Sequence, residues 1–509
     1  MTRQQLYFWT VICLCVCIIV SCGSSIAGTS LKLVSTPSAT TQGISTATMH
    51  TNLTSTAQVS PTPTAGSPIT LDNDDWPTFL LGDGRSGYNG AETHITPQTA
   101  SNLALYWSYH TNGGITTQPI VAKGVIYWGS WDGYEHATTL KGKQLWSAYL
   151  GVTRNENCGY PSLGVASTAT VGIVTMNNMP VQVVFVAGGN GYFYALNALN
   201  GKIIWSTLLG ITPLHFIWSS PLVYQGSVYE GVASLGDCPN AQGQLVQMNV
   251  SNGQVENVFN VVPDDCTGGS IWSSPTINTH TGELYITTGN AGNCNTGEAY
   301  AVSVIELHAV DLSFAGSWQV PPSQWDVDSD FGATPTLFSA TIHGAELPMV
   351  GAINKNGVYY AFVQGEIGNG PVWSRALSNV VGSIASSAWD GERLYVAGGN
   401  TTINGTFCQG SVNALDPATG KVIWQRCLTD ERELAPVTAT PGLIVVGEGR
   451  FLLMFNAITG KTVFEYEDTH EDSLFDGAPT IADGLLVVGN MDGYLYTFAP
   501  YQVRKPGLL

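Results

Sequence analysis

Three aspartates, Asp326, Asp328 and Asp330, alternate along one short segment of the chain. Residues two apart lie on the same side of an extended backbone, so Asp326 and Asp328 would point in one direction. Carboxylate oxygens are the hard ligands that Ca²⁺ prefers. The segment therefore indicates cation binding. The alternatives are solvated loop carboxylates and a purely structural calcium site.

Other residues with side chains suited to a site lie in turns of the sequence, and they are Ser234, Asp237, Trp272, Asn290 and Lys355. Several have a plainer interpretation. Asn290 beside a glycine is ordinary turn chemistry, Trp272 alone would be a core residue, and Lys355 before Asn-Gly would flank a hairpin. Whether the fold brings these residues together decides between the interpretations.

An even number of cysteines, six, follows residue 150. In an oxidising compartment they would form disulfides, and buried free thiols are the alternative. Cys408 precedes a third expected strand and Cys427 follows the fourth of the same unit, while Cys238 and Cys266 hold corresponding places in another unit. Antiparallel neighbours return side by side, so we expect Cys408–Cys427 and Cys238–Cys266, with Cys158–Cys294 left by elimination.

The elements that must position these residues follow from an internal repeat that starts at about residue 102. Each unit reads as four strands. The clearest copy runs through 183–189 and 192–199, a hairpin signal at Asn200-Gly201, and 202–209 with Trp205. The final unit, 478–498, has only three strands, whereas 103–109 at the start is a solitary last strand.

An aromatic residue recurs on the last strand of each unit, at Trp107, Trp146, Trp205, Phe259, Trp318, Trp373, Trp424 and Phe464. We expect these side chains to pack between neighbouring units rather than to bind a ligand. The sequence thus predicts an all-β fold, an eight-bladed β-propeller of four-stranded antiparallel blades, closed when the N-terminal strand completes the last blade. Seven blades is the alternative if loop insertions mislead the count.

The bulk composition agrees with many short strands joined by tight turns, since charged residues are only 11% and glycines number 58. A formal net charge of −19 without any basic cluster opposes nucleic acid and disfavours anionic substrates. No Cys-x-x-Cys-His motif occurs, so covalently attached haem is excluded. Gly-x-Ser-x-Gly, P-loop and His-Glu-x-x-His motifs are also absent, which argues against common hydrolase and nucleotide sites.

The N-terminus predicts the compartment. Arg3 precedes an apolar run over 6–20, and Cys22 follows directly after small and apolar residues. This resembles a bacterial lipoprotein signal, which implies cleavage before Cys22 and its acylation; an uncleaved anchor is the alternative. We expect a signal peptide over 1–21, a lipid-anchored disordered Ser/Thr/Pro-rich stalk over 22–70, and a propeller over 71–509, held outside the cytoplasm on a bacterial membrane.

Several motifs resemble the pyrroloquinoline-quinone-type propellers. They are Trp-Pro at 76–77, Gly-Asp-Gly-Arg-Ser-Gly-Tyr-Asn at 82–89, Ile-Thr-Pro at 95–97, Leu-Ala-Leu-Tyr-Trp at 103–107, the repeated Gly-Lys-hydrophobic-Trp turn, and the segment 325–333. With this last segment the resemblance is nearest to polyvinyl-alcohol-dehydrogenase-like and quinoprotein alcohol dehydrogenase-like proteins. It covers roughly residues 74–500.

The resemblance implies a site for pyrroloquinoline quinone and a metal, Ca²⁺ or a lanthanide. Trp272 matches the residue on which the quinone stacks, and Lys355 and Ser234 match cofactor contacts. The metal ligands would be Asp237, Asn290, Asp326 and Asp328, with Asp328 marking the lanthanide type. Asp326 also matches the catalytic base.

The chain departs from the family in three ways. Asp237 stands for a glutamate, an adjacent Cys-Cys pair is missing, and Trp218 stands near the place of a cofactor-contacting hydroxyl residue. The resemblance implies a quinone-dependent dehydrogenase-like lipoprotein that oxidises a small or polymeric alcohol and passes electrons to an external acceptor. Because related propellers include non-enzymatic assembly lipoproteins, the alternative is a scaffold or binding lipoprotein that has lost the cofactor.

Overall fold

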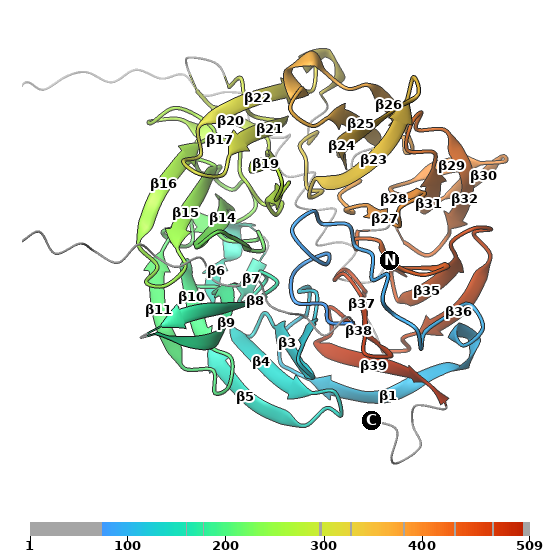
Figure 1. The fold of residues 1–509 in the computed structure, drawn as a ribbon, viewed down its shortest axis with the longest axis horizontal. Helices are drawn as coiled ribbons and strands as arrows, with labels where there is room; N and C mark the ends of the chain where they lie inside the picture. Colours follow the sequence, from blue (N-terminus) through green and yellow to red (C-terminus); the bar gives the residue numbers. More distant parts are fainter. Residues whose placement is uncertain are drawn as a thin grey trace, which may run out of the picture. The chain divides into compact units, whose positions relative to one another are not determined.

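A computed structural model of the chain describes residues 74–158, 160–176, 178–294, 298–325, 328–379, 382–431, 434–470 and 473–501. All of them belong to one compact unit, Ala65–Leu509. Eight sheets form a ring within this unit, each with four antiparallel blade strands (Figure 1). The predicted eight-bladed propeller is confirmed, and the seven-bladed alternative is wrong. The expected signal peptide, Cys22 and the expected stalk lie outside the described residues.

The blades are numbered in chain order of their first strands. Blade 1 consists of β2 (Ile120–Ala122), β3 (Val125–Gly129), β4 (Tyr134–Thr139) and β5 (Gln144–Tyr149), and blade 2 of β8 (Thr170–Met176), β9 (Met179–Ala187), β10 (Tyr192–Asn197) and β11 (Ile203–Leu208). Blade 3 consists of β13 (Leu222–Tyr224), β14 (Ser227–Ser234), β15 (Gln244–Asn249) and β16 (Val255–Asn260), with β12 (His215–Phe216) added beside β14. Blade 4 consists of β18 (Thr276–Ile277), β19 (Glu283–Thr287), β21 (Ser303–His308) and β22 (Phe314–Gln319).

Blade 5 consists of β23 (Thr336–Ile342), β24 (Ala345–Ile353), β25 (Val358–Val363) and β26 (Trp373–Ala376), and blade 6 of β27 (Ala388–Trp389), β28 (Leu394–Gly398), β31 (Gly410–Leu415) and β32 (Val422–Leu428). Blade 7 consists of β33 (Thr438–Thr440), β34 (Leu443–Glu448), β35 (Phe451–Asn456) and β36 (Thr462–Glu467). Blade 8 consists of β37 (Thr480–Ala482), β38 (Leu485–Gly489), β39 (Tyr494–Pro500) and β1 (Leu103–His110).

Short inserts join or interrupt the blades. They are the paired strands β6 (Thr153–Asn155) and β7 (Tyr160–Leu163), β17 (Thr267–Gly268) and β20 (Ala291–Asn293), and β29 (Thr401–Ile403) and β30 (Thr406–Cys408), and the 3-10 turns η1 (Ala100–Asn102), η2 (Glu156–Cys158), η3 (Pro322–Gln324) and η4 (Ile367–Asn369). Among the described residues, no helix is long and apolar enough to cross a membrane.

The position of a strand within its blade sets its residue pattern. Second strands such as β34 and β38 are buried along their whole length because both faces meet neighbouring blades. Their sequences accordingly begin with four consecutive residues of the Leu, Ile and Val types. Fourth strands such as β5 and β11 bury one residue each, the tryptophan, and their other residues are exposed or partly buried because the outer side of the blade meets solvent. The core therefore lies between the blades.

The ring closes as the sequence predicts. Strand β1 pairs antiparallel with β39, with Leu103 opposite Pro500 and His110 opposite Tyr494. The first described strand thus completes the last blade, and β39 is paired on both sides by strands from the two ends of the propeller.

The recurrent aromatic residues dock on the turn of the next blade. Trp146 on β5 donates its Nε1–H to the Ala198 carbonyl at 2.8 Å, and other outer tryptophans make the equivalent bond. Beneath the Trp146 ring lies Gly201, with φ of 68°, where an added Cβ would stand 2.6 Å from the ring. The predicted packing between blades is confirmed. Glycine is needed here both for the left-handed backbone and for the close ring contact.

A chain of hydroxyl groups links successive blades near their first strands. In each link a backbone N–H donates to a Ser or Thr side chain of the next blade, and the links run Gln118 to Thr168, Thr168 to Ser220, Ser220 to Ser274, Ser274 to Thr334, and Thr334 to Ser386, at 2.8–3.0 Å. These buried groups are hence satisfied, and the spacing of blades 1 to 6 is fixed.

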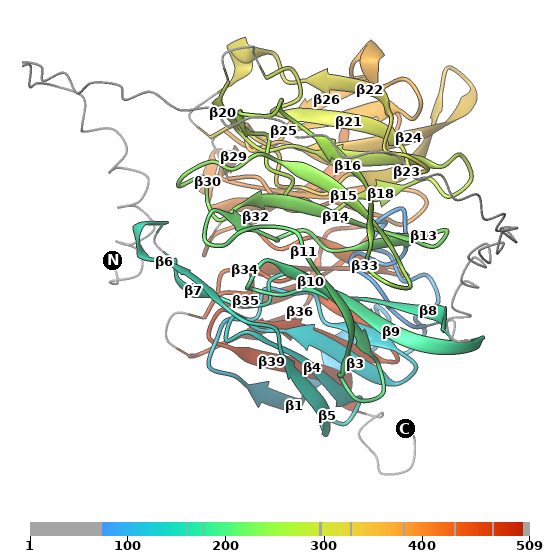
Figure 2. The same ribbon diagram turned by 90° about the vertical axis from the view of Figure 1, so that its left-hand side faces the viewer.

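The segment before β1 contacts every blade. Its hydrogen bonds, in blade order, join Trp76 to Val121, Pro77 to Val171, Arg85 to Pro221, Asp83 to Ile277, Gly84 to Leu337, Ser86 to Trp389, Asn89 to Ala439 and Asn89 to Ile481. Arg85 is fully buried and also donates to the carbonyls of Phe79 and Pro275. In Figures 1 and 2 this arm (blue) lies inside the ring, on the side away from the β6–β7 and β29–β30 inserts.

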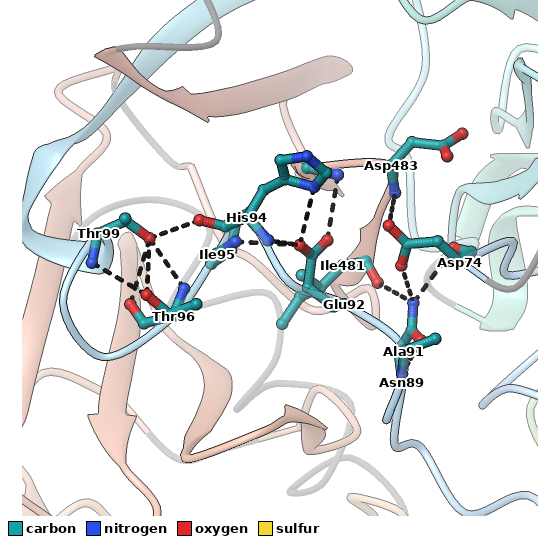
Figure 3. Close-up of polar contacts among 11 residues, drawn as sticks. Asp74, Asn89, Ala91, Glu92, His94, Ile95, Thr96, Thr99, Ile481 and Asp483 are labelled. Atoms are coloured by element: carbon teal, nitrogen blue, oxygen red, sulfur yellow. Dashed lines mark hydrogen bonds and ion pairs between the residues drawn. The ribbon is translucent and has the colours of Figure 1, made fainter.

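Two carboxylates fasten the arm to the turn between β37 and β38 (Figure 3). Glu92, whose side chain is fully buried, accepts the Gly484 N–H at 3.1 Å, and Asp74 accepts the Asp483 N–H at 3.1 Å. With His94 these carboxylates place possible metal-ligand atoms within 4.8 Å of one another. Their oxygens already accept backbone N–H groups, so they act as a clamp on the arm.

The six cysteines among the described residues form disulfides: Cys158–Cys238, Cys266–Cys294 and Cys408–Cys427. The expected pair Cys408–Cys427 is confirmed, whereas the expected pairs Cys238–Cys266 and Cys158–Cys294 are wrong. The reason is that inserts, not blade strands, position these four residues. Strand β17 pairs with β20, which brings Cys266 beside Cys294, and the β6–β7 insert brings Cys158 against the loop after β14.

Candidate functional site

The site residues described come from three consecutive blades, 3 to 5. Ser234 ends β14, Asn290 follows β19 and Lys355 follows β24, and these are the second strands of their blades. Trp272 precedes β18, and Asp330 precedes β23, which are first strands. Second strands run antiparallel to first strands, so the ends of the former and the starts of the latter meet at one end of the ring.

Asn290 lies between two carboxylates from its neighbouring blades. Its Nδ2 donates to Asp237 Oδ2 at 3.0 Å and to Asp328 Oδ1 at 2.8 Å. Asp237 has a left-handed backbone, with φ of 57°, and its N–H donates to the Ser234 hydroxyl at 2.9 Å. The Ser234 hydroxyl in turn donates to Asp237 Oδ1. Oxygen ligands from blades 3 and 5 therefore converge on one amide from blade 4.

A second group of contacts surrounds Asp330. Its Oδ2 accepts the Trp272 Nε1–H at 2.9 Å, and its Oδ1 pairs with Lys355 Nζ at 2.6 Å. Lys355 Nζ also pairs with Asp328 Oδ1 at 2.8 Å and lies 4.8 Å from the centre of the Trp272 ring. Asp328 is shared between the two groups, so Asp237, Asn290, Asp328, Lys355, Asp330 and Trp272 form one connected network.

The carboxylates of the network differ in exposure and charge. Burial raises the pKa of Asp330 to about 6, against the opposing effect of Lys355 and with a further rise from the Asp328 charge. Burial also disfavours ionised Asp328, but Lys355 and Asn290 outweigh it and lower the pKa of that carboxyl. Burial lowers the pKa of Lys355, and the charges of Asp330 and Asp328 more than reverse this. The network holds three carboxylates, of Asp237, Asp328 and Asp330, and one ammonium, which leaves an excess of negative charge.

The donor set fits a hard cation and a flat ligand. Asp237 and Asp328 both hold an oxygen within 3.0 Å of the same Asn290 nitrogen, and a turned amide would offer a third oxygen. Trp272 is only partly buried, so part of its ring is open to a partner. Lys355 lies beside that ring and is the cation suited to a ligand's oxygens.

The structure thus brings together Ser234, Asp237, Trp272, Asn290, Asp328 and Lys355, and their roles stay predictions. Asp326, the predicted base and metal ligand, lies outside the described residues. Sequence reasoning gave Asp330 no role, although it extends the alternating aspartates. The only signal was that alternation. Trp218 lies one blade away, with its Nε1–H donating to the Ser234 carbonyl at 3.3 Å.

Comparison with known proteins gives two kinds of relative. A family profile described as "Outer membrane protein assembly factor BamB" matches residues 364–502. The quinohemoprotein alcohol dehydrogenase of Comamonas testosteroni is 22% identical over 56% of this chain and 44% of its own length. The polyvinylalcohol dehydrogenase of Sphingopyxis sp. (strain 113P3) is 23% identical over 76% of this chain and 68% of its own length.

Solved structures agree on the fold. The C. testosteroni enzyme superposes with a TM-score of 0.67 at 17% identity, covering 84% of this chain and 80% of that chain. A europium-containing methanol dehydrogenase gives 0.68 at 16% identity, covering 84% and 98%. The chain spans less than half the length of the C. testosteroni enzyme in the sequence comparison, so that match does not extend to the whole enzyme.

Proposed function

We propose that this chain, a β-propeller of the pyrroloquinoline-quinone type, is a quinone-dependent alcohol dehydrogenase-like protein that oxidises a hydroxyl substrate outside the cytoplasm. One observation carries the proposal. Side chains from blades 3, 4 and 5, far apart in sequence, form a single network with a carboxylate-rich part beside Asn290 and an aromatic part at Trp272. A fold needs neither a surplus of carboxylates nor a lysine next to an indole at this place.

Asp237, Asn290, Asp328 and Asp326 are the proposed metal ligands, for Ca²⁺ or a lanthanide. The aspartate carboxylates repel one another until a cation enters, so the network favours a divalent or trivalent ion. Ser234 holds the Asp237 carboxylate in place through its hydroxyl. Trp272 offers the flat face for the quinone, and Lys355 stabilises negative charge on the ligand.

When bound, the quinone supplies a two-electron acceptor for the alcohol's hydride and the metal polarises the quinone carbonyl. Asp326 is the proposed base, which takes the substrate's hydroxyl proton on its carboxylate. Electrons would then pass to an external acceptor.

The compartment is part of the proposal. Acylation of Cys22 would hold the propeller on a bacterial membrane through the 22–70 stalk. Palmitate labelling of the full chain in cells tests this: the label is expected on the wild type and lost in Cys22→Ser. Equal labelling of both would contradict the anchor.

Reconstitution of the purified chain with pyrroloquinoline quinone and Ca²⁺ or La³⁺ tests the activity. Cofactor absorbance should stay with the protein, and dye-linked alcohol oxidation should follow. Asp326→Asn is expected to abolish turnover while the quinone stays bound, because the base is lost but the stacking surface is not. Trp272→Ala should weaken quinone binding by roughly 30-fold, since about 2 kcal/mol of apolar contact is lost.

Trp389→Ala is the matched control. Trp389 is also a partly buried tryptophan, but it lies on β27 of blade 6, so its loss should leave quinone affinity within a few-fold of the wild type. A chain that takes up no quinone with either metal contradicts the proposal.

That outcome would favour the rival function, a non-catalytic scaffold. The assembly-factor profile and the missing Cys-Cys pair support the rival. The profile match at 364–502, however, covers the later blades, and every candidate cofactor or metal residue precedes it. The match therefore carries no information about the site.

A further inference from the structure

Asp330 is the most buried carboxylate among the described residues of the site, with 3% of its side-chain surface exposed. Each of its two oxygens has a different partner. Oδ2 accepts the Trp272 Nε1–H at 2.9 Å and Oδ1 meets Lys355 Nζ at 2.6 Å. A carboxylate that divides its oxygens in this way fixes the relative position of an indole and an ammonium.

The backbone of the segment is itself held from two blades. The Phe331 N–H donates to the Thr288 carbonyl of blade 4 at 3.3 Å, and the Lys355 N–H of blade 5 donates to the Asp330 carbonyl at 3.0 Å. The indole has little freedom to shift, because a Cβ added at Gly332 would stand 2.2 Å from Trp272 Cη2. The ring is thus held by Asp330 at its N–H edge and by the chain beneath its benzene edge.

Asp328 provides a contrast two residues earlier. Its side chain is 45% exposed, and it contacts Asn290 as well as Lys355. Asp330 contacts Trp272 and Lys355 instead, and both of these are assigned to the quinone rather than the metal. Asp328 therefore joins the two halves of the site, whereas the side-chain contacts of Asp330 with Trp272 and Lys355 lie in the quinone half.

We propose that Asp330 is a positioning residue for a planar, anionic quinone: it locks the Trp272 face and the Lys355 ammonium in one fixed arrangement. This rests on the proposed function, because both partners are cofactor contacts only if a quinone binds. A structural ion pair alone would explain the bond to Lys355 but not the second bond to the indole edge. Removing the arrangement should weaken quinone binding without removing any group that touches the quinone.

The test measures pyrroloquinoline quinone binding to the full chain at saturating Ca²⁺, by quenching of tryptophan fluorescence. Asp330→Asn should raise the quinone Kd about tenfold, the equivalent of one charged hydrogen bond. In a Trp272→Phe background the same change should have little further effect, because Asp330 acts largely through that indole. Asp468→Asn is the matched control, because it also changes a nearly fully buried aspartate, one that follows β36 in blade 7 outside the site, and it should leave the quinone Kd unchanged.

A second measurement needs no quinone. Near-ultraviolet circular dichroism should change on Asp330→Asn in the wild type but not in the Trp272→Phe background. If the wild type binds no quinone, the proposed function fails, while this spectrum still reports whether Asp330 orders Trp272.

Unchanged quinone affinity together with an unchanged spectrum overturns the proposal, as do effects that simply add to those of Trp272→Phe. If Asp330→Asn does not fold, Asp330→Glu keeps the charge but moves the oxygens by one methylene. A weakened Kd for Asp330→Glu supports the fixed arrangement, and a wild-type Kd overturns it.

Discussion

The same five residues, Ile-Trp-Ser-Ser-Pro, occur at 217–221 in blade 3 and at 271–275 in blade 4. The local backbone roles are equivalent, since Ser220 and Ser274 occupy successive links of the hydroxyl chain. The two tryptophans nevertheless have different partners. Trp218 packs edge-on against Phe216 at 4.6 Å and donates to a backbone carbonyl, whereas Trp272 donates to the Asp330 carboxylate beside Lys355.

The difference comes from the segments that reach each tryptophan. Around Trp218 the β6–β7 insert and its disulfide supply an apolar cluster that includes Cys158, Cys238 and Leu235. Around Trp272 the 328–330 segment and the turn after β24 supply charge. The same pentapeptide thus contributes a tryptophan to an apolar cluster in blade 3 and a tryptophan to the candidate ligand site in blade 4. The following changes test this contrast, from the largest expected effect to the smallest.

Lys355→Met should lower the free energy of unfolding by about 3–5 kcal/mol, because it leaves the buried Asp330 charge without its partner. Urea denaturation followed by fluorescence measures this. Combining Lys355→Met with Asp330→Asn removes both charges and should recover most of the loss. A single variant within about 1 kcal/mol of the wild type would show that charge does not hold the Trp272 surroundings together.

Replacing Cys158 and Cys238 by alanine should lower the free energy of unfolding by about 2–4 kcal/mol. The disulfide joins residues 80 positions apart, and without it the unfolded chain gains conformational entropy. The matched control is Cys408→Ala with Cys427→Ala, whose separation is 19 residues. It should cost roughly 1 kcal/mol less in the chain-entropy account. Thermal unfolding under non-reducing conditions compares the two. Equal losses of stability in the two variants would contradict the chain-entropy account. A loss found only in the control would show that the Cys158–Cys238 disulfide does not stabilise the surroundings of Trp218.

Ser220→Ala and Ser274→Ala should each cost about 1 kcal/mol, since each leaves one buried backbone N–H of the preceding blade without its acceptor. The two losses should agree within about 0.5 kcal/mol, as both serines perform the same blade-to-blade link. Denaturation midpoints at constant m-value give the comparison. A much larger loss for Ser274 would mean that the two pentapeptides differ already in their backbone role.

Features that depend on neighbouring residues in the chain could be predicted from the sequence. The Asn200-Gly201 turn and Trp205 define a repeat, and counting its aromatics gave the eight blades. The solitary strand at 103–109 predicted closure on β39, because the last unit has only three strands and lacks its fourth. Cys408 and Cys427 were paired correctly for the same reason, since they flank strands of one blade.

Features that depend on inserts could not be predicted in this way. The pairing of Cys158, Cys238, Cys266 and Cys294 follows from β6–β7 and β17–β20, which carry no repeat pattern. The arm at 76–89 served only as a family marker in the sequence, yet it bonds to all eight blades. Its contacts are mostly backbone hydrogen bonds, which leave little trace in residue type.

The sequence by itself determined the blade count, the closure and most candidate site residues, because these rest on local periodicity and on motifs. Only the tertiary structure decided that Asp237, Asn290 and Asp328 meet, that Asp330 joins Trp272 to Lys355, and that Trp218 does not share this environment. The physical reason is that a side chain's partners come from blades tens of residues away. Residue type fixes what a group can do, and the packing of distant segments fixes with which partner it does so.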